Sequence, residues 1–503
     1  MIKKLPSILR SPYTALSICL LFSSPLFFLR GIGIFDDSVF LKIGELIVDG
    51  LVPYRDVFDN KPPGIYYLAA VIAAISNNHW LAPRLFLFVF AALFGIWVIK
   101  YTRNYWGDLA AYLVAWIFGL SYTITQGYSF HTDQFCAFFG FAAVVAISSK
   151  HSQARYSWFL AGLSIGVAFL FKQVAVIYLV AILCFFITKF IGGKIYFNKI
   201  INNYILLVTG FAIPQLVTFY IILLYEIFPD FYDAVFISTL PFAEQSINIA
   251  DVIKLWVKIP AVWLNILCFL ILMINKKILH RTKNLANVSD LLLIVVVGCL
   301  SLIPSLKQSS NTHYIGSSLV FLSISAAVIL SSLLLYLKKQ LSLLKIRITF
   351  ILIFSIFLAY LLAIIWGGNL MISQKRWEYD LAQMSEIQSK LNLYLTPEEP
   401  ILALSDNAPR IYYMSGRKPQ IKYIYYYGTG WLNSKIPSLD NAANLLVKGE
   451  TPGAILETTK DALPKHIHDF PKYQLIELST SEHPVYNTHT VIMVRKDIVD
   501  KKS

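Results

Sequence analysis

The segment Phe58 to Ile75, FDNKPPGIYYLAAVIAAI, places a lysine and two prolines directly before an apolar run. Proline fixes its own φ and drives the preceding residue into an extended conformation, so a helix is predicted to begin at Pro62 or Pro63 and not at Lys61. The backbone N–H groups at that helix start and the Lys61 ammonium then face the same place, which favours an anion such as phosphate. The alternative is that Lys61 only extends to the lipid headgroups.

A second lysine interrupts an apolar stretch further along the chain, FLFKQVAV, which contains Lys172 and Gln173. Burying an ammonium group in a membrane costs a few kcal/mol unless an anion or a water-filled cavity receives it. Lys172 is therefore a stronger candidate for binding a negatively charged substrate than a lysine in a loop.

Carboxylates, imidazoles and a phenol stand at the ends of other apolar segments, where ionisable groups are functional candidates. Helix capping by Thr132 or Asp133, solvation of the acidic pair and an interfacial role for the tyrosine are the simpler explanations of each residue taken alone. The candidates are Asp36, Asp37, His131, Asp133, His313 and Tyr314.

Composition indicates what kind of fold must position these residues. Hydrophobic residues make up 57% of the chain and charged residues 14%, which excludes an ordinary soluble globule and favours a polytopic α-helical membrane protein. Apolar segments recur from Ala15 to Ile365, and most are long enough to cross a hydrocarbon core of about 30 Å. The net charge of +14 lies mainly in the links between them, which indicates membrane orientation and not nucleic-acid binding. The five cysteines fall in apolar segments or at their edges, so no disulfide framework is expected.

The short apolar run Gly64 to Ile75 decides the topology, because about a dozen residues are too few to span a membrane. It is predicted to lie at the membrane surface. With the second crossing at Leu81 to Ile99, the basic links and the basic N-terminus MIKKLPSILR all fall on the cytoplasmic side. A retained helix from Tyr13 to Leu29 is favoured over a signal peptide, since no small-residue cleavage site follows it. The sequence predicts about eleven crossings, the last from Thr349 to Trp366.

This topology places the candidate residues on the outer face of the plasma (inner) membrane. Residues 1–372 are predicted to form a transmembrane domain whose first outer loop, residues 31–80, contains surface helices, and the segment after Asp37 has the spacing of an amphipathic one. Residues 373–503 are predicted to form a C-terminal extracytoplasmic α/β domain, with a helix KRWEYDLAQMSEIQSKLNLYL and then short apolar runs such as PILALSD and RIYYMSG. Its aromatic run Tyr423 to Tyr427 is more simply explained by a strand that buries alternate aromatics than by sugar stacking.

Taken in order and on one side, these residues resemble a known family. The chain is similar to the polyprenyl-phosphate-sugar-dependent glycosyltransferases of the GT-C class, which include the protein O-mannosyltransferases and the lipid A aminoarabinose transferase. The family's usual Asp-Glu pair is Asp-Asp here, which leaves open whether Asp37 takes the place of the Glu. In the aminoarabinose transferase a Glu precedes the motif lysine and an Arg follows the acidic pair, whereas those places hold Asn60 and, approximately, Val39 here, which weakens any transfer of that enzyme's substrate. The resemblance rests on Asp36 and Asp37, DGLVPYRDVFDNKPPGIYYL, Asp133, FLFKQ at Lys172, and THY at His313 and Tyr314.

The resemblance implies transfer of a sugar from a polyprenyl-phosphate donor to a glycan, lipid or protein acceptor outside the membrane, with inversion at the anomeric carbon. It implies that Asp36 is the general base and that Lys61 and Lys172 hold the donor phosphate, with help from His313 or Tyr314. Whether Asp133 orients the acceptor or binds a divalent cation together with Asp36 stays open, and no other cofactor is expected. The residues expected to position substrates are Tyr54, Arg55, Asn60, His131 and Gln173.

Two other classes of membrane protein handle lipid-linked sugars. A flippase or other transporter is expected to show internal repeats and charges along both ends of its path, whereas this sequence contains no repeat and gathers its candidates on one side. An O-antigen ligase or polymerase is expected to use a pyrophosphate donor and to have a large outer loop late in the chain. An enzyme at the outer surface is therefore the favoured interpretation.

Overall fold

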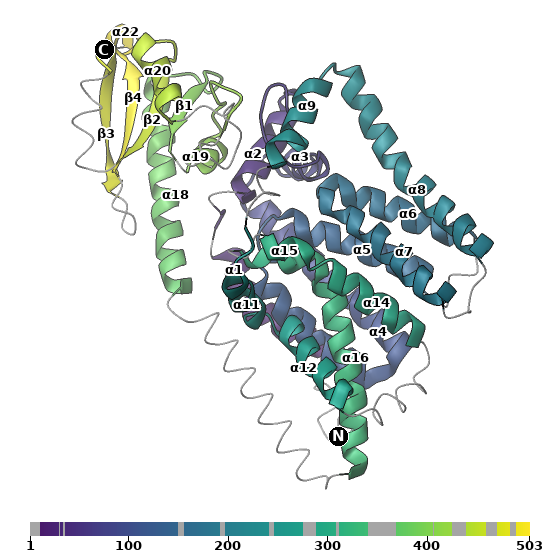
Figure 1. Cartoon of the computed structure of the whole chain (residues 1–503). Helices are drawn as coiled ribbons and strands as arrows, with labels where there is room; N and C mark the ends of the chain where they lie inside the picture. The colour runs from purple at the N-terminus through teal and green to yellow at the C-terminus, as the bar shows by residue number, and fades with distance from the viewer. Residues whose placement is uncertain are drawn as a thin grey trace. The chain divides into compact units, whose positions relative to one another are not determined.

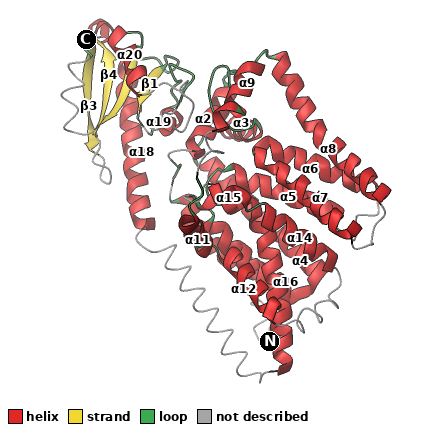
Figure 2. Ribbon diagram, viewed as in Figure 1, coloured by secondary structure: helices red, strands yellow, loops and turns green. Residues whose placement is uncertain are grey.

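The computed structural model is mostly helical (Figures 1 and 2). It divides into two compact units, which are described separately. The helical unit comprises Met1–Phe27, Leu85–Ile221 and Gln245–Gly367, and the mixed unit comprises Phe28–Arg84, Ile222–Glu244 and Gly368–Ser503. The residues described are 11–29, 31–33, 36–148, 155–191, 197–240, 246–274, 288–307, 311–340, 369–405, 407–424, 439–458, 470–482 and 489–502.

The helical unit is a bundle of apolar helices. Glycines allow α6 and α8 to approach closely, because a Cβ at Gly162 would lie 1.9 Å from the Leu207 carbonyl oxygen and a Cβ at Gly210 would lie 2.1 Å from the Phe159 carbonyl oxygen. Its elements are α1 (Pro12–Phe28), α4 (Leu81–Ile124), α5 (Thr132–Ile147), α6 (Arg155–Phe171), η3 (Gln173–Ala175), α7 (Val176–Ile191), α8 (Phe197–Leu224), α11 (Ile249–Val257), α12 (Pro260–Ile274), α14 (Val288–Leu300), α15 (Ile303–Lys307), η5 (Thr312–Ile315) and α16 (Gly316–Gln340).

Four of the described helical segments are long and apolar enough to cross a membrane, and a fifth arises if α11 and α12, bent by 97°, act as one broken span. Shorter apolar helices of the helical unit, such as α1, α5 and α6, have 16 or 17 residues. The total of about eleven crossings therefore stays a prediction. The predicted last helix, Thr349 to Trp366, lies outside the described residues.

The second crossing differs from its prediction in one respect. The basic link after Ile99 does not interrupt the helix, because helical structure continues as far as Gly107, whose φ of +85° and ψ of −180° break α4. Arg103 Nε bonds Asp108 Oδ1 across this break at 2.7 Å. A glycine adopts this conformation without the clash that a side chain would cause, so the turn between the two halves of α4 needs only one non-helical residue.

The mixed unit combines helices with a four-stranded sheet of order β1-β2-β4-β3. β1 and β2 are parallel, whereas β4 is antiparallel to both of its neighbours. Leu404, Leu456 and Met493 are buried in its apolar core with Leu446 of α20. The elements are α2 (Asp36–Val48), α3 (Gly64–Ser76), α9 (Phe228–Val235), η4 (Ile237–Thr239), α18 (Asn369–Tyr394), β1 (Ile401–Leu404), α19 (Ala408–Ser415), α20 (Leu439–Lys448), β2 (Gly453–Thr458), β3 (Tyr473–Glu482), β4 (His489–Arg495) and α22 (Lys496–Lys502).

One expectation for the tail is corrected. The run RIYYMSG forms a helix, α19, and not a strand, since Pro409 stands in its first turn and Gly416 ends it with a φ of +68°. The predicted separate domain from residue 373 stays a prediction, because these residues belong to the same compact unit as the first outer loop. Most of the aromatic run ending at Tyr427 lies outside the described residues; Tyr423 itself forms a bridge with Phe58.

The two helices of the first outer loop pack against each other. α3 is 13 residues long, as its apolar run predicts, and begins at Gly64 with Pro63 as its N-cap, one residue later than expected. α3 and α19 both pack on α2, and ten of its 13 residues are buried; its predicted place at the membrane surface stays a prediction. A Cβ at Gly44 would lie 2.6 Å from Ala69, so this glycine permits the close approach of α2 to α3.

Candidate active site

The loop before α3 holds Lys61 through hydrogen bonds from two tyrosines. Tyr54 donates its hydroxyl to the Lys61 carbonyl at 2.8 Å, and the Lys61 backbone N–H donates to the Tyr66 hydroxyl at 3.0 Å. Tyr66 in turn donates to Asp59 Oδ2 at 2.6 Å. The Lys61 Nζ, which is half buried, donates to Asn60 Oδ1 at 2.6 Å. These contacts fix the backbone of Lys61 three residues before the start of α3, and the anion site predicted there stays a prediction.

Tyr54 adopts an unusual backbone conformation with a φ of 72°. A non-glycine residue in this region is uncommon and often marks a functional loop. Its backbone N–H donates to the Val57 carbonyl at 2.8 Å, and its ring packs edge-on against Phe231 of α9 at 5.2 Å. The neighbouring Arg55, also predicted to position substrate, is half exposed and paired with Asp56 at 2.8 Å.

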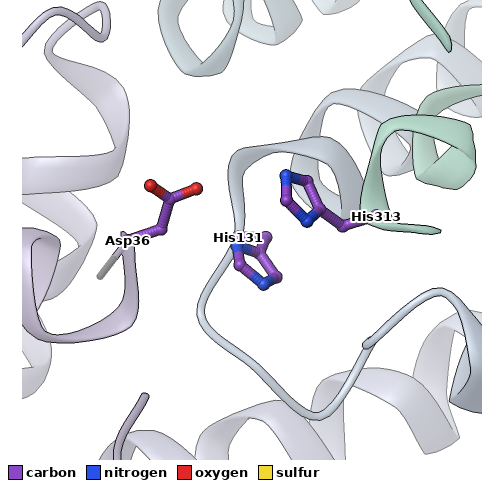
Figure 3. Close-up of side chains that lie close together, drawn as sticks. All are labelled: Asp36, His131 and His313. Carbon is purple, nitrogen blue, oxygen red and sulfur yellow. The ribbon is translucent and has the colours of Figure 1, made fainter. Parts of the chain in front are cut away.

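The acidic pair is divided between two environments. Asp37 is buried, and its Oδ2 accepts from Arg84 Nη2 at 2.5 Å and from the Gly33 backbone N–H at 2.9 Å. Arg84 also donates to the Gly31 carbonyl. Asp36 (Figure 3) is the first residue of α2, and its side chain is half buried. The carboxylate of Asp37 is therefore committed to a structural contact, which favours Asp36 as the group that meets substrate.

Arg84 was missed by sequence reasoning although a signal was present. It stands four residues into the apolar run that begins at Leu81, and its side chain is 2% exposed. An arginine in such a position needs a partner of opposite charge. The sequence could have raised that question, but it could not have named Asp37, which lies 47 positions earlier.

In the helical unit, Lys172 and Asp133 form a buried ion pair. Lys172 Nζ lies 2.8 Å from Asp133 Oδ1 and 2.7 Å from Oδ2, and Ser317 donates its hydroxyl to Oδ1 at 2.8 Å. The Tyr314 ring lies 4.6 Å from the same ammonium group. The anion that the sequence required for Lys172 is therefore present in the chain as Asp133. Because both oxygens of Asp133 bond Lys172, the divalent-cation alternative gains no support from this carboxylate and stays a prediction.

The two predicted histidines stack on each other beside this ion pair. Their ring centroids are 4.3 Å apart with planes at 15° (Figure 3), and His313 also contacts the Tyr314 ring at 4.2 Å. His131 Nε2 lies 3.2 Å from Gln126 Oε1. The predicted residue Gln173 begins η3 with a half-buried side chain. One pocket is lined by Phe94, Phe118, Tyr122, Thr125, Gln126, Gly127, His131, Asp133, Gln134, Ala137, His313, Gly316, Leu319 and Val320. The structure thus brings together, within the helical unit, residues predicted from three separate links.

A second buried ion pair in the mixed unit was not predicted. Lys42 is fully buried in α2, and its Nζ lies 2.9 Å from Glu45 Oε1. Burial lowers the pKa of Lys42 and raises the pKa of Glu45, while each charge partly offsets the effect on the other. Asp49 and Lys418, 3.3 Å apart, lie near this pair. Because buried ion pairs lose much of their attraction to desolvation, this one sets how α2 packs more than how strongly it is held.

Lys42→Met is expected to lower the free energy of unfolding by about 3–5 kcal/mol at neutral pH, since it leaves the Glu45 carboxylate buried without its partner. The pKa of Glu45, already above its ordinary value of 4.5, should rise further, so the folded state binds a proton that the unfolded state lacks. Stability of the variant therefore falls as the pH rises above 4.5 and is recovered in acid. Thermal unfolding in detergent at several pH values measures this.

The control for this prediction is Lys254→Met on α11. Lys254 and Asp251 have the same spacing and a similar distance, 3.0 Å, but both are exposed, so the loss should be small and independent of pH. The double variant Lys42→Met with Glu45→Leu should unfold near the wild-type temperature. A single variant as stable as the control at pH 8 would contradict the burial of this pair.

Comparisons with known proteins place these sites in a family context. Residues 60–227 match the family model described as dolichyl-phosphate-mannose-protein mannosyltransferase, and this range includes Lys61, Asp133 and Lys172. The fold is similar to that of ArnT from Cupriavidus metallidurans bound to undecaprenyl phosphate, with a TM-score of 0.65 and 14% identity over 95% of this chain and 97% of that one. The predicted resemblance to GT-C glycosyltransferases is confirmed.

A further GT-C fold is also similar. The archaeal oligosaccharyltransferase AglB from Archaeoglobus fulgidus, in complex with an inhibitory peptide and a dolichol-phosphate, has a TM-score of 0.52 and 13% identity over 88% of this chain and 69% of that one. A comparison with curated proteins gave no significant match. The family match over residues 60–227, the shared fold and several apolar helices among the described residues agree with the expected membrane glycosyltransferase.

Proposed function

We propose that this protein is an integral membrane glycosyltransferase that moves a sugar from a polyprenyl-phosphate donor to an acceptor outside the cell membrane, with inversion of the anomeric carbon. The observation that carries the proposal is the fixed position of Lys61 beside the start of α3. The family match begins at Asn60, the residue that bonds this lysine. The structure of similar fold with bound undecaprenyl phosphate supports a polyprenyl phosphate as the lipid part of the donor.

The phosphate of the donor is assigned to the α3 end of the loop. Backbone N–H groups at a helix start attract negative charge, and an ammonium group strengthens such a site. The Asn60 side chain limits the rotamers of Lys61, so little entropy is lost when a phosphate binds. The Lys61 ammonium group also stabilises the charge that grows on the phosphate as the glycosidic bond breaks.

Asp36 is assigned as the general base. The acceptor hydroxyl oxygen forms a bond to the anomeric carbon, the bond from that carbon to the phosphate oxygen breaks, and the phosphate leaves with the electron pair while Asp36 takes the hydroxyl proton. A single displacement needs no carboxylate nucleophile and inverts the anomeric carbon. The commitment of Asp37 to Arg84 supports this choice between the two aspartates.

The pocket of the helical unit is assigned to substrate positioning. Lys172 has three N–H donors, and the two oxygens of Asp133 account for two of them. The third N–H group of Lys172, with His313 and Tyr314 near it, can then donate a hydrogen bond to an oxygen atom of the sugar-donor substrate. Asp133 supplies the opposite charge for the buried Lys172 ammonium group, at 2.7 Å.

Incubation of the purified protein with synthetic polyprenyl-phosphate sugars and several acceptors tests the proposal. Loss of donor, appearance of glycosylated acceptor and the opposite anomeric configuration in the product are expected. Complete inertness toward every donor, combined with movement of lipid-linked sugar across liposomes, would instead establish the transporter alternative.

Lys61→Ala is expected to raise the Kd for polyprenyl phosphate by about 10- to 100-fold, because a hydrogen bond to a charged group contributes about 1.5–3 kcal/mol. Titration of the detergent-solubilised protein with polyprenyl phosphate measures the change. Lys254→Ala, which removes an exposed lysine, is the control and should leave the Kd unchanged. An unchanged Kd in Lys61→Ala would mean that this lysine only contacts lipid headgroups.

A further inference from the structure

The segment that leads to Asp36 is held by residues from the far end of the chain. Gly31 has a φ of +76°, and a Cβ at this position would lie 1.9 Å from Cδ2 of Trp377. The Trp377 indole, which is 5% exposed, therefore rests directly on the Gly31 backbone. Trp80 packs edge-on against the same indole at 5.2 Å. Only glycine leaves room for this contact, so Gly31 and Trp377 fit as a pair.

Arg84 contacts both Gly31 and Asp37, which lie on either side of Asp36 in the sequence. Its Nη2 donates both to the Gly31 carbonyl and to Asp37 Oδ2, which also accepts from the Gly33 backbone N–H. Asp36 stands between these anchored residues. Asp37, which directly follows Asp36, is thus held by Arg84, and Gly31 and Gly33 are held earlier in the same segment.

A buried ion pair joins the two tail helices α18 and α19. Arg410 of α19 bonds Asp380 of α18 through two contacts, Nη1 to Oδ2 at 2.6 Å and Nη2 to Oδ1 at 3.1 Å, and both side chains are buried. Bidentate pairs of this kind fix orientation as well as distance. α19 packs on α2, the helix that Asp36 begins.

We propose that Trp377 and Arg84 are positioning residues for Asp36, so that α18 and α19 of the tail act as a brace that aims the catalytic base. This inference rests on the proposed function. A base must stand within hydrogen-bond reach of the proton that it removes, and a misplacement of about 1 Å can cost about 100-fold in rate. Removal of the brace is therefore expected to slow the chemical step without changing how the donor binds.

Trp377→Ala tests the proposal through the separate effects on kcat, KM and donor binding. We expect kcat to fall by about 10- to 100-fold, while the Kd for polyprenyl phosphate changes by less than about twofold. Trp377→Phe, which keeps an aromatic ring on Gly31, should recover most of the rate. Leu393→Ala, an exposed position on the same helix, is the matched control and should behave as wild type.

Gly31→Ala supplies a second, independent variant, because its new methyl group displaces the indole from the other side of the contact. It should show the same loss of kcat with unchanged donor binding, including where Trp377→Ala does not fold. A wild-type kcat in a folded Trp377→Ala or Gly31→Ala protein would contradict the proposal. An equal loss of kcat in Leu393→Ala would contradict it too. Failure of the proposed function is distinct, since the wild-type protein itself would then transfer no sugar.

Discussion

Asp36→Asn is expected to lower kcat by about 100- to 10,000-fold, the range that a general base contributes, while the Kd for polyprenyl phosphate stays near the wild-type value. Asparagine has almost the same shape but cannot accept the acceptor proton. The position of Asp36 at the half-buried start of α2 makes a large structural loss unexpected. Single-turnover transfer and donor titration on the same preparation measure the two quantities.

Two further variants serve as controls for Asp36→Asn. Asp108→Asn changes an exposed carboxylate and should have no effect on transfer. Asp37→Asn weakens a buried partner of Arg84 and should lower the unfolding temperature as well as the rate, because the arginine loses its counter-charge. If Asp36→Asn turned over normally and Asp37→Asn were inactive yet fully stable, the assignment of the two aspartates would have to be exchanged.

Asp133→Asn is expected to destabilise the helical unit by about 3–5 kcal/mol, since it leaves the Lys172 ammonium buried without a carboxylate. The double variant Asp133→Leu with Lys172→Met should regain most of the wild-type unfolding temperature but should not regain transfer. The double variant therefore separates the effect of the pair on stability from its effect on sugar transfer. A single substitution at either position changes both at once. Thermal unfolding and sugar transfer, measured in the same detergent, supply both values.

The exposed pair on α11 is the matched control for this cycle, because replacing Asp251 and Lys254 together should change neither property. Wild-type transfer in the double Asp133 and Lys172 variant would show that the buried pair serves the fold alone. Loss of both stability and transfer in that variant would mean that apolar side chains cannot fill the site.

Local sequence chemistry predicted several of these features correctly. The prolines after Lys61 placed the start of α3 within one residue, since the restriction they impose is local. The length of its apolar run predicted a helix too short to cross a membrane. The cost of burying Lys172 called for an anion or a water-filled cavity beside it, and the carboxylate of Asp133 lies there, although the pairing of these two residues was not predicted.

Partners far apart in the chain could not be predicted in this way. The amphipathic spacing of α2 predicted a helix with one apolar face, but it could not predict that α19, several hundred residues later, packs on it. Periodicity reports that a helix has an apolar face and does not report what packs on its polar one. The same limit applies to Arg84 with Asp37 and to Trp377 with Gly31, whose pairing is set by the fold.

The packing of α19 on α2 also fixes the order of events during synthesis. About 360 residues separate the two helices, so at about 5–20 residues per second roughly 20–70 s pass between their translation. During that interval the apolar side chains of α2, with Lys42 and Glu45 among them, have no α19 to cover them. Chaperones that shield exposed apolar surface act on such intermediates. The first loop to be made is therefore among the last parts of the enzyme to be completed.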